Sequence, residues 1–531
     1  MKDKILFILI VILAIGLRFW DLGKNPPGIN LDEAAIGYNA YSILKTGRDE
    51  YGQFMPLAFR SLDDYKPPLY VYLTVPSVAI FGLNEFAVRF PSAILGVGAV
   101  ILVYFLTREL FKSALCSLLS ALLLAISPWH LQFTRTAYET GSLAFFTSAG
   151  LLFFLFGLKK WPWLILSAII FGSELFLYQA AKVFVPLFLF AISIAYLRKQ
   201  LAVFWVVFLI FFIPTIVLSV SREGRLRAYG TSIFQDYRPP AANLELKRQD
   251  WLRDDWKSAA VFHPEAFSFV PEILKNYLIH LSPWFFISPN LGAKVTYAPN
   301  VGLMYLWELP FLLAGMYFLA NLKDKRPLFI FGCWLLFSPV AASVTTGLPS
   351  SIRTAVFLPS LQMITAVGII GLLKKYRWLI FCLLPFAFCL FLFYMHMYFV
   401  HAPIVNSKVW YQGYRQIIKE SFELSKKYDR VLVSNHLDQP LNFYQFFLKY
   451  DPVKFLIEDG GRVSGGFAEN QNHLGKFYFR QNLEYQRERK VPKTLFVGTP
   501  QDFPSEVAIP IKKYQFLSGE ESAYIVAGDY Q

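Results

Sequence analysis

Long apolar runs recur through the first 400 residues of this chain, and they limit what it can fold into. Most of them are about 17 to 25 residues long, the length that a helix needs to cross a hydrocarbon layer of about 30 Å. They predict spans at residues 3–20, 86–107, 114–133, 141–157, 162–178, 183–197, 201–219, 301–320, 327–345, 354–373 and 376–399. The chain is therefore predicted to be a polytopic α-helical membrane protein with about 11 transmembrane helices.

Composition and charge agree with this fold class. The 531 residues are 55% hydrophobic and only 17% charged, whereas soluble proteins are about 25% charged. The net charge is +14, but the basic residues lie in short clusters between apolar runs instead of forming the continuous stripe of a nucleic-acid-binding face. We therefore expect membrane lipids, and no nucleic acid, among the partners.

The basic clusters also predict the orientation of the chain. The apolar stretch 69–83 is short for a membrane span. When it is placed along the membrane interface, six basic clusters fall on one side of the membrane, as expected of a cytoplasmic face. The other side then receives residues 21–85, the turn near Glu139, the long loop 220–300, the turn 346–353 and everything after residue 400. The clusters are Lys2/Lys4, Arg108/Lys112, Lys159/Lys160, Arg198/Lys199, Lys323/Lys325/Arg326 and Lys374/Lys375/Arg377.

Two regions are expected: a transmembrane domain over residues 1–400 and a small α/β domain over residues 401–531 on the extracytoplasmic side. Residues 410–427 have the pattern of an amphipathic helix, and strands are expected at 430–434, 476–480, 493–498 and 522–527. The loop 220–300 mixes cations with aromatic residues, such as Trp251, Trp256 and His263, that suit a sugar or a lipid head group.

Two adjacent acids, Asp32 and Glu33, follow the first span directly. Asn30 with Glu33 three residues later is the pattern of a capping box at a helix start, which would make Glu33 a structural residue. That interpretation leaves Asp32 in the first turn of a helix at the membrane surface. Solvated acids are also common there, so the residues alone leave a role in chemistry and a plain surface role equally open.

Three further residues are predicted on the same face. Glu139 could form a helical ion pair with Arg135, or it could join Asp32 in a site. Lys66, before Pro67-Pro68, marks a turn or binds a lipid phosphate. Arg353 is an interfacial anchor or a bidentate phosphate ligand. No histidine has spacing that closes a metal site, and the chain has no nucleotide-binding Gly-rich loop.

The arrangement resembles a known family. Asp32-Glu33, Tyr65-Lys66-Pro67-Pro68-Leu69, Glu85 to Arg89 with Pro91-Ser92-Ala93, and Ser127-Pro128 with Arg135 and Glu139 are similar to the protein O-mannosyltransferase and aminoarabinose transferase group. These are GT-C fold enzymes of glycosyltransferase family 39, which includes phospholipid carrier-dependent glycosyltransferases. The resemblance is strongest over residues 15–160, returns weakly at Arg353 and is absent from the C-terminal tail.

The resemblance implies an inverting glycosyltransferase that moves a hexosyl or pentosyl group from a polyprenyl-phosphate donor to a hydroxyl acceptor. It implies Asp32, Glu33 and Glu139 as catalytic residues, with Asp32 as the base, and Lys66 and Arg353 as ligands of the donor phosphate. The site would lie at the outer face of the cell membrane. A protein, a lipid or a glycan is an equally open acceptor, and a divalent cation stays open as a cofactor.

Two other functions fit the same sequence. A transporter or flippase of lipid-linked sugars would need access to its site from both faces of the membrane. A membrane envelope scaffold would depend on the C-terminal region and would not need Asp32.

Overall fold

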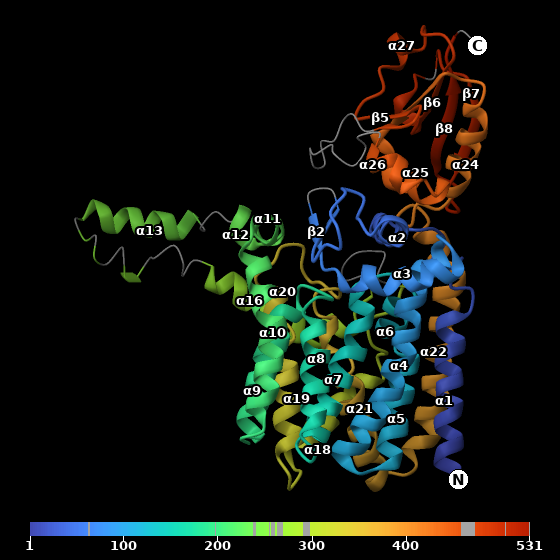
Figure 1. Ribbon diagram of the computed structural model, residues 1–531. Coiled ribbons are helices and arrows are strands. Elements are labelled where there is room, and N and C mark those ends of the chain that lie inside the picture. The colour runs from blue at the N-terminus through green and yellow to red at the C-terminus, as the bar shows by residue number, and fades with distance from the viewer. Residues whose placement is uncertain are drawn as a thin grey trace.

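The computed structural model describes the chain except residues 62–63, 197, 237–240, 254, 256, 258–260, 263–268, 290–297, 458–472, 505 and 530–531. Two of the loop residues named above, Trp256 and His263, lie outside the described residues. A tall helical bundle carries a smaller mixed α/β region at one end, and the N-terminus lies at the opposite end (Figure 1). The chain is thus mostly helical, as its apolar runs predict.

The bundle is built from the apolar runs. Its helices are α1 (Lys2–Phe19), α4 (Glu85–Phe111), α5 (Ala114–Ile126), α6 (Pro128–Thr134), α7 (Leu143–Gly157), α8 (Pro162–Glu174), α9 (Ala181–Tyr196), α10 (Leu201–Val220), α18 (Glu308–Ala320), α19 (Arg326–Phe337), α20 (Val340–Ser343), α21 (Ser360–Lys375), α22 (Leu379–His396) and α23 (Ala402–Val405). Short helical turns join some of them, at Glu139–Ser142, Ala355–Phe357 and Met397–His401.

Within the described residues, five helical stretches are long and apolar enough to cross a membrane, and a sixth is counted if the bent pair α5–α6 is one span. The five are Glu85–Phe111, Glu139–Gly157, Leu201–Val220, Arg326–Ser343 and Phe381–Val405. These helices make the chain a multi-pass membrane protein. The number of 11 transmembrane helices stays a prediction.

Several predicted spans are shorter or bent in the structure. The run 114–133 bends by 58° where α5 meets α6, because Pro128 cannot donate to the preceding turn. In the run 301–320 the long helix is α18, which has only 13 residues and is shorter than a span. Before it, Met304 N donates to the Phe286 carbonyl at 2.9 Å. The run 354–373 becomes α-helical only at Ser360, after Pro359. Tertiary contacts satisfy the backbone at these places, as a membrane interior requires.

The basic turns gather at one end of the bundle. Glu109, near the end of α4, pairs with Lys112 at 2.8 Å and with Lys159 of the α7–α8 turn at 2.5 Å. Arg198, after α9, donates to the Leu158 carbonyl at 3.1 Å. Three of the predicted clusters therefore lie together, which supports the alternating path of the helices. Which membrane face they occupy stays a prediction.

The first loop forms two helices, α2 (Leu31–Thr46) and α3 (Leu69–Phe81), and a short hairpin, β1 (Phe59–Ser61) with β2 (Asp64–Lys66). The predicted capping box is present: Glu33 N donates to Asn30 Oδ1 at 2.8 Å, and Asn30 N donates to Glu33 Oε2 at 3.4 Å. Helix α3 has only 13 residues, contains Pro76 and packs against α2 and α4. Both α2 and α3 lie at the end of the bundle beneath the C-terminal sheet (Figure 1).

The described part of the long loop 220–300 is largely helical. It contains α11 (Arg222–Thr231), α12 (Ile233–Asp236), α13 (Ala241–Leu252), α16 (Val270–Leu281) and α17 (Pro283–Ile287). Of these, α13 projects away from the bundle, whereas α11 lies near the β1–β2 hairpin and contacts β2 (Figure 1).

The C-terminal region holds a six-stranded sheet of order β4-β5-β3-β6-β8-β7, in which β3 is parallel to β5 and β6. The predicted strands are confirmed. Their bounds are β3 (Arg430–Ser434), β4 (His473–Leu474), β5 (Phe477–Arg480), β6 (Thr494–Gly498), β7 (Pro510–Gln515) and β8 (Glu521–Ala527). The helices are α24 (Tyr414–Ser425), α25 (Pro440–Leu448), α26 (Pro452–Ile457) and α27 (Tyr485–Glu488).

Helix α2 joins this region to the bundle. It contacts both α25 and α26, and Tyr38 donates to the Tyr450 carbonyl at 3.2 Å. A Cβ added at Gly37 would lie 2.5 Å from the Phe446 ring, so the close approach of α25 depends on the glycine. The C-terminal region thereby covers the helix that begins with the acid pair.

A glycine contact between α18 and α21 is predicted to be essential for bundle packing. In Gly368→Ala the new Cβ would lie 1.8 Å from the Phe311 carbonyl oxygen, so the helices must separate, at a cost of about 1–3 kcal/mol or more. We expect a lower unfolding temperature for the detergent-purified protein. Gly332→Ala in α19 is the matched control, since its Cβ would meet no atom within 4 Å. Equal unfolding temperatures for the two variants would contradict the prediction.

Candidate functional site

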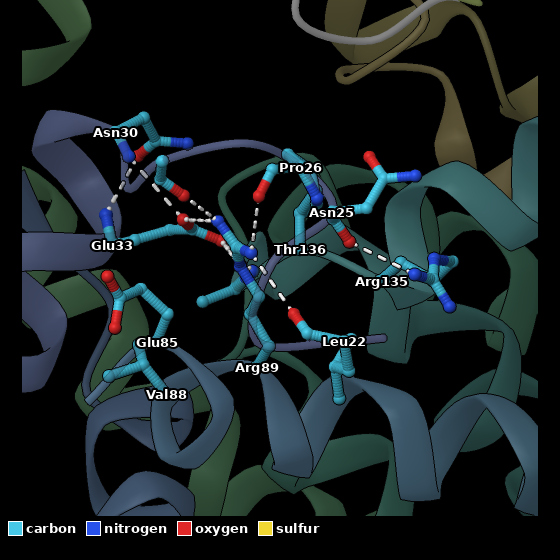
Figure 2. Close-up of polar contacts among 12 residues, drawn as sticks. Leu22, Asn25, Pro26, Asn30, Glu33, Glu85, Val88, Arg89, Arg135 and Thr136 are labelled. Carbon is cyan, nitrogen blue, oxygen red and sulfur yellow. Dashed lines mark hydrogen bonds and ion pairs between the residues drawn. The ribbon is translucent and has the colours of Figure 1, made fainter. Parts of the chain in front are cut away.

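The site is built around a buried ion pair between Glu33 of α2 and Arg89 of α4 (Figure 2). Both side chains are 0% exposed. Arg89 Nε donates to Glu33 Oε1 at 3.0 Å, and a terminal nitrogen donates to Oε2 at 2.9 Å. Ala137 N, from the turn after α6, donates to Oε1 at 2.8 Å. Glu33 therefore ties together three separate segments of the chain.

Arg89 also fixes the loop that precedes α2. Its remaining N–H groups donate to the carbonyls of Leu22 (3.1 Å), Pro26 (3.0 Å) and Gly28. A guanidinium has five donors, and all five are used. Figure 2 shows Arg89 rising from its helix into the centre of the loop, with Glu33 on one side and the Leu22 and Pro26 carbonyls on the other.

Arg135 holds the beginning of the same loop. It is fully buried, and its terminal nitrogens donate to four backbone carbonyls while Nε donates to the Tyr398 hydroxyl at 3.2 Å. The carbonyls are those of Leu17 (2.8 Å), Arg18 (3.1 Å), Trp20 (2.8 Å) and Asn25 (3.0 Å). Arg135 thus stabilises the C-terminal end of α1, where carbonyls lack partners within the helix.

Asp32 points away from this buried network. Its side chain is 52% exposed, and it accepts a short hydrogen bond from the ammonium of Lys66, whose side chain is only 8% exposed. The hairpin β1–β2 ends at Lys66, and Leu69 N after it donates to the Phe176 carbonyl at 3.0 Å. These contacts place Lys66 beside Asp32, a pairing that the sequence did not indicate.

Glu139 belongs to the same neighbourhood. It begins the short turn before α7 and is half-buried. The Tyr138 hydroxyl accepts a hydrogen bond from the Asn30 amide at 3.2 Å. Burial raises the pKa of Tyr138 well above its usual value, and the negative charges of Asp32, Glu33 and Glu139 raise it further. The three predicted acids therefore lie within electrostatic range of Tyr138.

The C-terminal region closes one side of the site. A Cβ added at Gly28 would lie 2.0 Å from the Trp410 carbonyl oxygen, so the segment after α23 lies directly on the loop before α2. The Tyr411 hydroxyl donates to Asp438 Oδ2. Burial raises the pKa of Tyr411, the contact with Asp438 raises it further, and Asp32 makes a smaller contribution. A residue of the C-terminal region thus lies within electrostatic range of Asp32.

Lys66 and Arg353 line different cavities. Lys66 lines a cavity of about 440 Å³ with the segment 53–58 and the end of α8. Arg353 lines a cavity of about 670 Å³ beside α9 and α11, and it donates to Thr345 Oγ1 at 2.8 Å and to the Thr346 carbonyl. Gln179, Lys182 and Gly224 line both cavities. The structure therefore brings Lys66 to Asp32 and sets Arg353 in the neighbouring cavity.

Metal binding at this site has no independent support from side-chain geometry. Within the described part of the chain, no group of three or more His, Cys, Asp or Glu side chains is arranged to hold a metal ion. A divalent cation as a cofactor stays a hypothesis.

Sequence reasoning missed several residues of this site. Arg89 belongs to the motif Glu85 to Arg89, but the motif does not indicate its pairing with Glu33; the local signal is Asn84, the N-cap that sets where α4 begins. Tyr138 precedes Glu139 directly and could have been noted with it. For Lys182 the only signal was a lysine at the start of an apolar run, which is common at membrane surfaces.

Comparisons with known proteins match this architecture. Residues 65–219 match the family model described as dolichyl-phosphate-mannose-protein mannosyltransferase. The crystal structure of ArnT from Cupriavidus metallidurans in the apo state matches 98% of this chain and 97% of its own, with a TM-score of 0.55 and 13% identity. The chain therefore has the fold of this structure, the GT-C fold.

Two further matches cover very different shares of this chain. ArnT from Cupriavidus metallidurans bound to undecaprenyl phosphate matches 98% of the chain and 97% of its own, with a TM-score of 0.54 and 14% identity. An uncharacterized protein of Aquifex aeolicus (strain VF5) is 31% identical over 146 residues, which are 27% of this chain. That match spans 28% of the relative's own length.

The buried ion pair is predicted to hold the GT-C chain's first loop in place. Glu33→Gln removes the charge opposite Arg89 and leaves that cation buried without a counter-charge. Breaking such a pair costs about 3–5 kcal/mol, so we expect a lower unfolding temperature in detergent. Glu109→Gln is the control, since its lysine partners are exposed and such pairs contribute at most about 1 kcal/mol. An unchanged unfolding temperature for Glu33→Gln would refute the structural role.

Proposed function

We propose that this chain is an inverting glycosyltransferase that moves a sugar from a polyprenyl-phosphate donor to a hydroxyl acceptor at the outer face of the cell membrane. The observation that carries the proposal is the contact between Asp32 and Lys66. A half-exposed carboxylate contacts a buried ammonium, and the lysine that carries this ammonium lines a cavity of about 440 Å³. The relative crystallised with undecaprenyl phosphate supports a lipid-linked donor.

The proposed reaction is a single displacement. The acceptor oxygen attacks C1 of the sugar while the bond between C1 and the phosphate oxygen breaks, and the bond electrons leave with the polyprenyl phosphate. The Asp32 carboxylate takes the proton of the acceptor hydroxyl as general base. Attack from the face opposite the leaving phosphate inverts the configuration at C1.

The other residues stabilise charge, position Asp32 or line the site. Lys66 and Arg353 offset the negative charge that grows on the leaving phosphate. Because Lys66 also contacts Asp32, a phosphate that draws the ammonium toward it frees the carboxylate for the acceptor proton. Glu33 positions Asp32 through the start of α2 and does not itself touch substrate. Glu139, with Tyr138, forms the wall on the acceptor side.

The first test is Asp32→Asn. It keeps the size of the side chain and removes its basicity, and loss of a general base lowers the rate by about 10²–10⁴-fold. The purified protein is assayed for release of undecaprenyl phosphate from a panel of undecaprenyl-phosphate-linked hexoses and pentoses, with membrane extract as the acceptor source. Glu33 is untouched, Asp32 is half-exposed, and the asparagine oxygen still accepts a hydrogen bond from Lys66, so the unfolding temperature is expected to fall much less than in Glu33→Gln.

Asp451→Asn is the matched control. It makes the same change at an exposed aspartate of the C-terminal region whose Oδ1 caps Val453 N at 2.8 Å, a contact that asparagine also makes. It is expected to keep full activity. Wild-type activity of Asp32→Asn would exclude Asp32 as the base. If the wild type releases no undecaprenyl phosphate from any donor of the panel, the proposed reaction is excluded.

A further inference from the structure

The last long helix of the bundle, α22, ends in a π-helical turn. The turn covers Met397–His401 and leads directly into α23. A π-helix bonds each residue to the fifth along the chain, and such turns are rare and frequently lie at functional sites. This one is attached to the first loop, because the Tyr398 hydroxyl accepts from Arg135 Nε at 3.2 Å and the Tyr398 carbonyl accepts from the Asn25 amide at 3.3 Å. Tertiary contacts therefore hold the π turn in place.

The π turn brings two histidines together. His396 and His401 are five residues apart, a spacing that places side chains about 140° apart around the axis of a regular α-helix. Across the π turn the two rings meet instead. Their Nε2 atoms are 3.1 Å apart, and their ring centroids are 4.8 Å apart. A local sequence pattern holds no sign of this pair, since only the π turn creates it.

The two Nε2 atoms are placed to hold a metal ion as well as to share a hydrogen bond. In the neutral pair one Nε2–H donates to the other Nε2. Zinc binds imidazole nitrogen at about 2.0–2.1 Å, so an ion bonded to two nitrogens at this separation has an N–Zn–N angle of about 100°, close to that of a tetrahedral site. Binding moves the proton of the donor ring from Nε2 to Nδ1, so both rings stay neutral.

The histidine pair is open to ions from outside the bundle. His396 is exposed and His401 is half-buried. The pair lies near the level of the first loop, because Arg135 bonds both Tyr398 in the π turn and the Trp20 carbonyl. The side chain of Trp20 is 70% exposed, and tryptophans of membrane proteins gather at the boundary between lipid and water. Water or a lipid head group can therefore reach an ion bound here.

The ring nitrogens determine the class of metal. Imidazole is a ligand of zinc, copper and nickel ions, whereas magnesium and calcium prefer oxygen ligands. Among the residues that the structure describes, no third His, Cys, Asp or Glu side chain joins the pair. The pair therefore offers two protein ligands, and oxygen atoms from water or a head group fill the other positions of the ion.

We propose that His396 and His401 form a binding site for a divalent transition-metal ion such as Zn²⁺. The ion bridges the last residue of α22 and the residue before α23, and so clamps the π turn that joins the bundle to the C-terminal region. An ion that binds only the folded turn stabilises the folded chain. This site goes beyond the proposed transfer reaction and does not depend on it.

The test measures zinc binding by the detergent-purified full chain, prepared with an affinity tag that lacks histidine and stripped of metal with EDTA. Zn²⁺ is titrated by calorimetry into the wild type, His396→Ala, His401→Ala and His436→Ala. His436 is the matched control, because it is a half-exposed histidine of the C-terminal region whose Nδ1 lies 2.6 Å from Asp502 Oδ1. Pulsed electron paramagnetic resonance of bound Cu²⁺ counts the imidazoles that coordinate the ion.

We expect the wild type to bind Zn²⁺, His396→Ala and His401→Ala each to lose at least about tenfold in affinity, and His436→Ala to keep the wild-type affinity. The Cu²⁺ spectrum is expected to show two imidazoles in the wild type and one in each variant of the pair. Zn²⁺ is expected to raise the unfolding temperature of the wild type and not that of His396→Ala, whereas Mg²⁺ changes neither.

Glutamine variants at both positions are measured as well, because a polar side chain of similar size keeps the test open if an alanine variant does not fold. A folded wild type that binds no Zn²⁺ would overturn the inference, as would wild-type affinity in either variant of the pair or a loss confined to His436→Ala. None of these results bears on the transfer reaction, which Asp32→Asn tests separately.

Discussion

The buried ion pair of Glu33 and Arg89 is the interaction on which the proposed site depends. Removing two charges from water costs several kcal/mol for each ion, and the pair repays this only when the remaining donors and acceptors are also satisfied. Here all five guanidinium donors and both carboxylate oxygens have partners. Such a pair specifies one arrangement of its surroundings, because any other would leave a buried charge unpaired.

The shape of the first loop follows from this pair and from Arg135. Together the two arginines hold seven backbone carbonyls between residues 17 and 28. The loop can then be irregular beside a membrane without leaving polar groups unpaired. It ends at the capping box of α2, which leaves Asp32 in the first turn, turned toward Lys66. The segment after α23 packs onto Gly28, so the C-terminal region depends on the same loop.

This arrangement places the two adjacent acids in different surroundings. Glu33 is buried and fully paired, and it sets the position of the helix. Asp32 is one residue away but lies on another side of α2, since adjacent positions on a helix point about 100° apart. Its carboxylate is therefore exposed and contacts a lysine that lines a cavity. One sequence element supplies both the support of the proposed site and its reactive group.

Much of this was predictable from local sequence. The apolar runs determined that the chain is a helical membrane protein, Asn30 with Glu33 determined where α2 begins, and short β-branched and aromatic runs determined the C-terminal strands. These features depend on neighbours within a few residues. Tertiary structure alone decided that Lys66 meets Asp32 across 34 residues, that Arg89 neutralises Glu33, and that Arg353 lines a separate cavity. Such contacts depend on how helices cross and where loops return, and a local pattern holds no information on either.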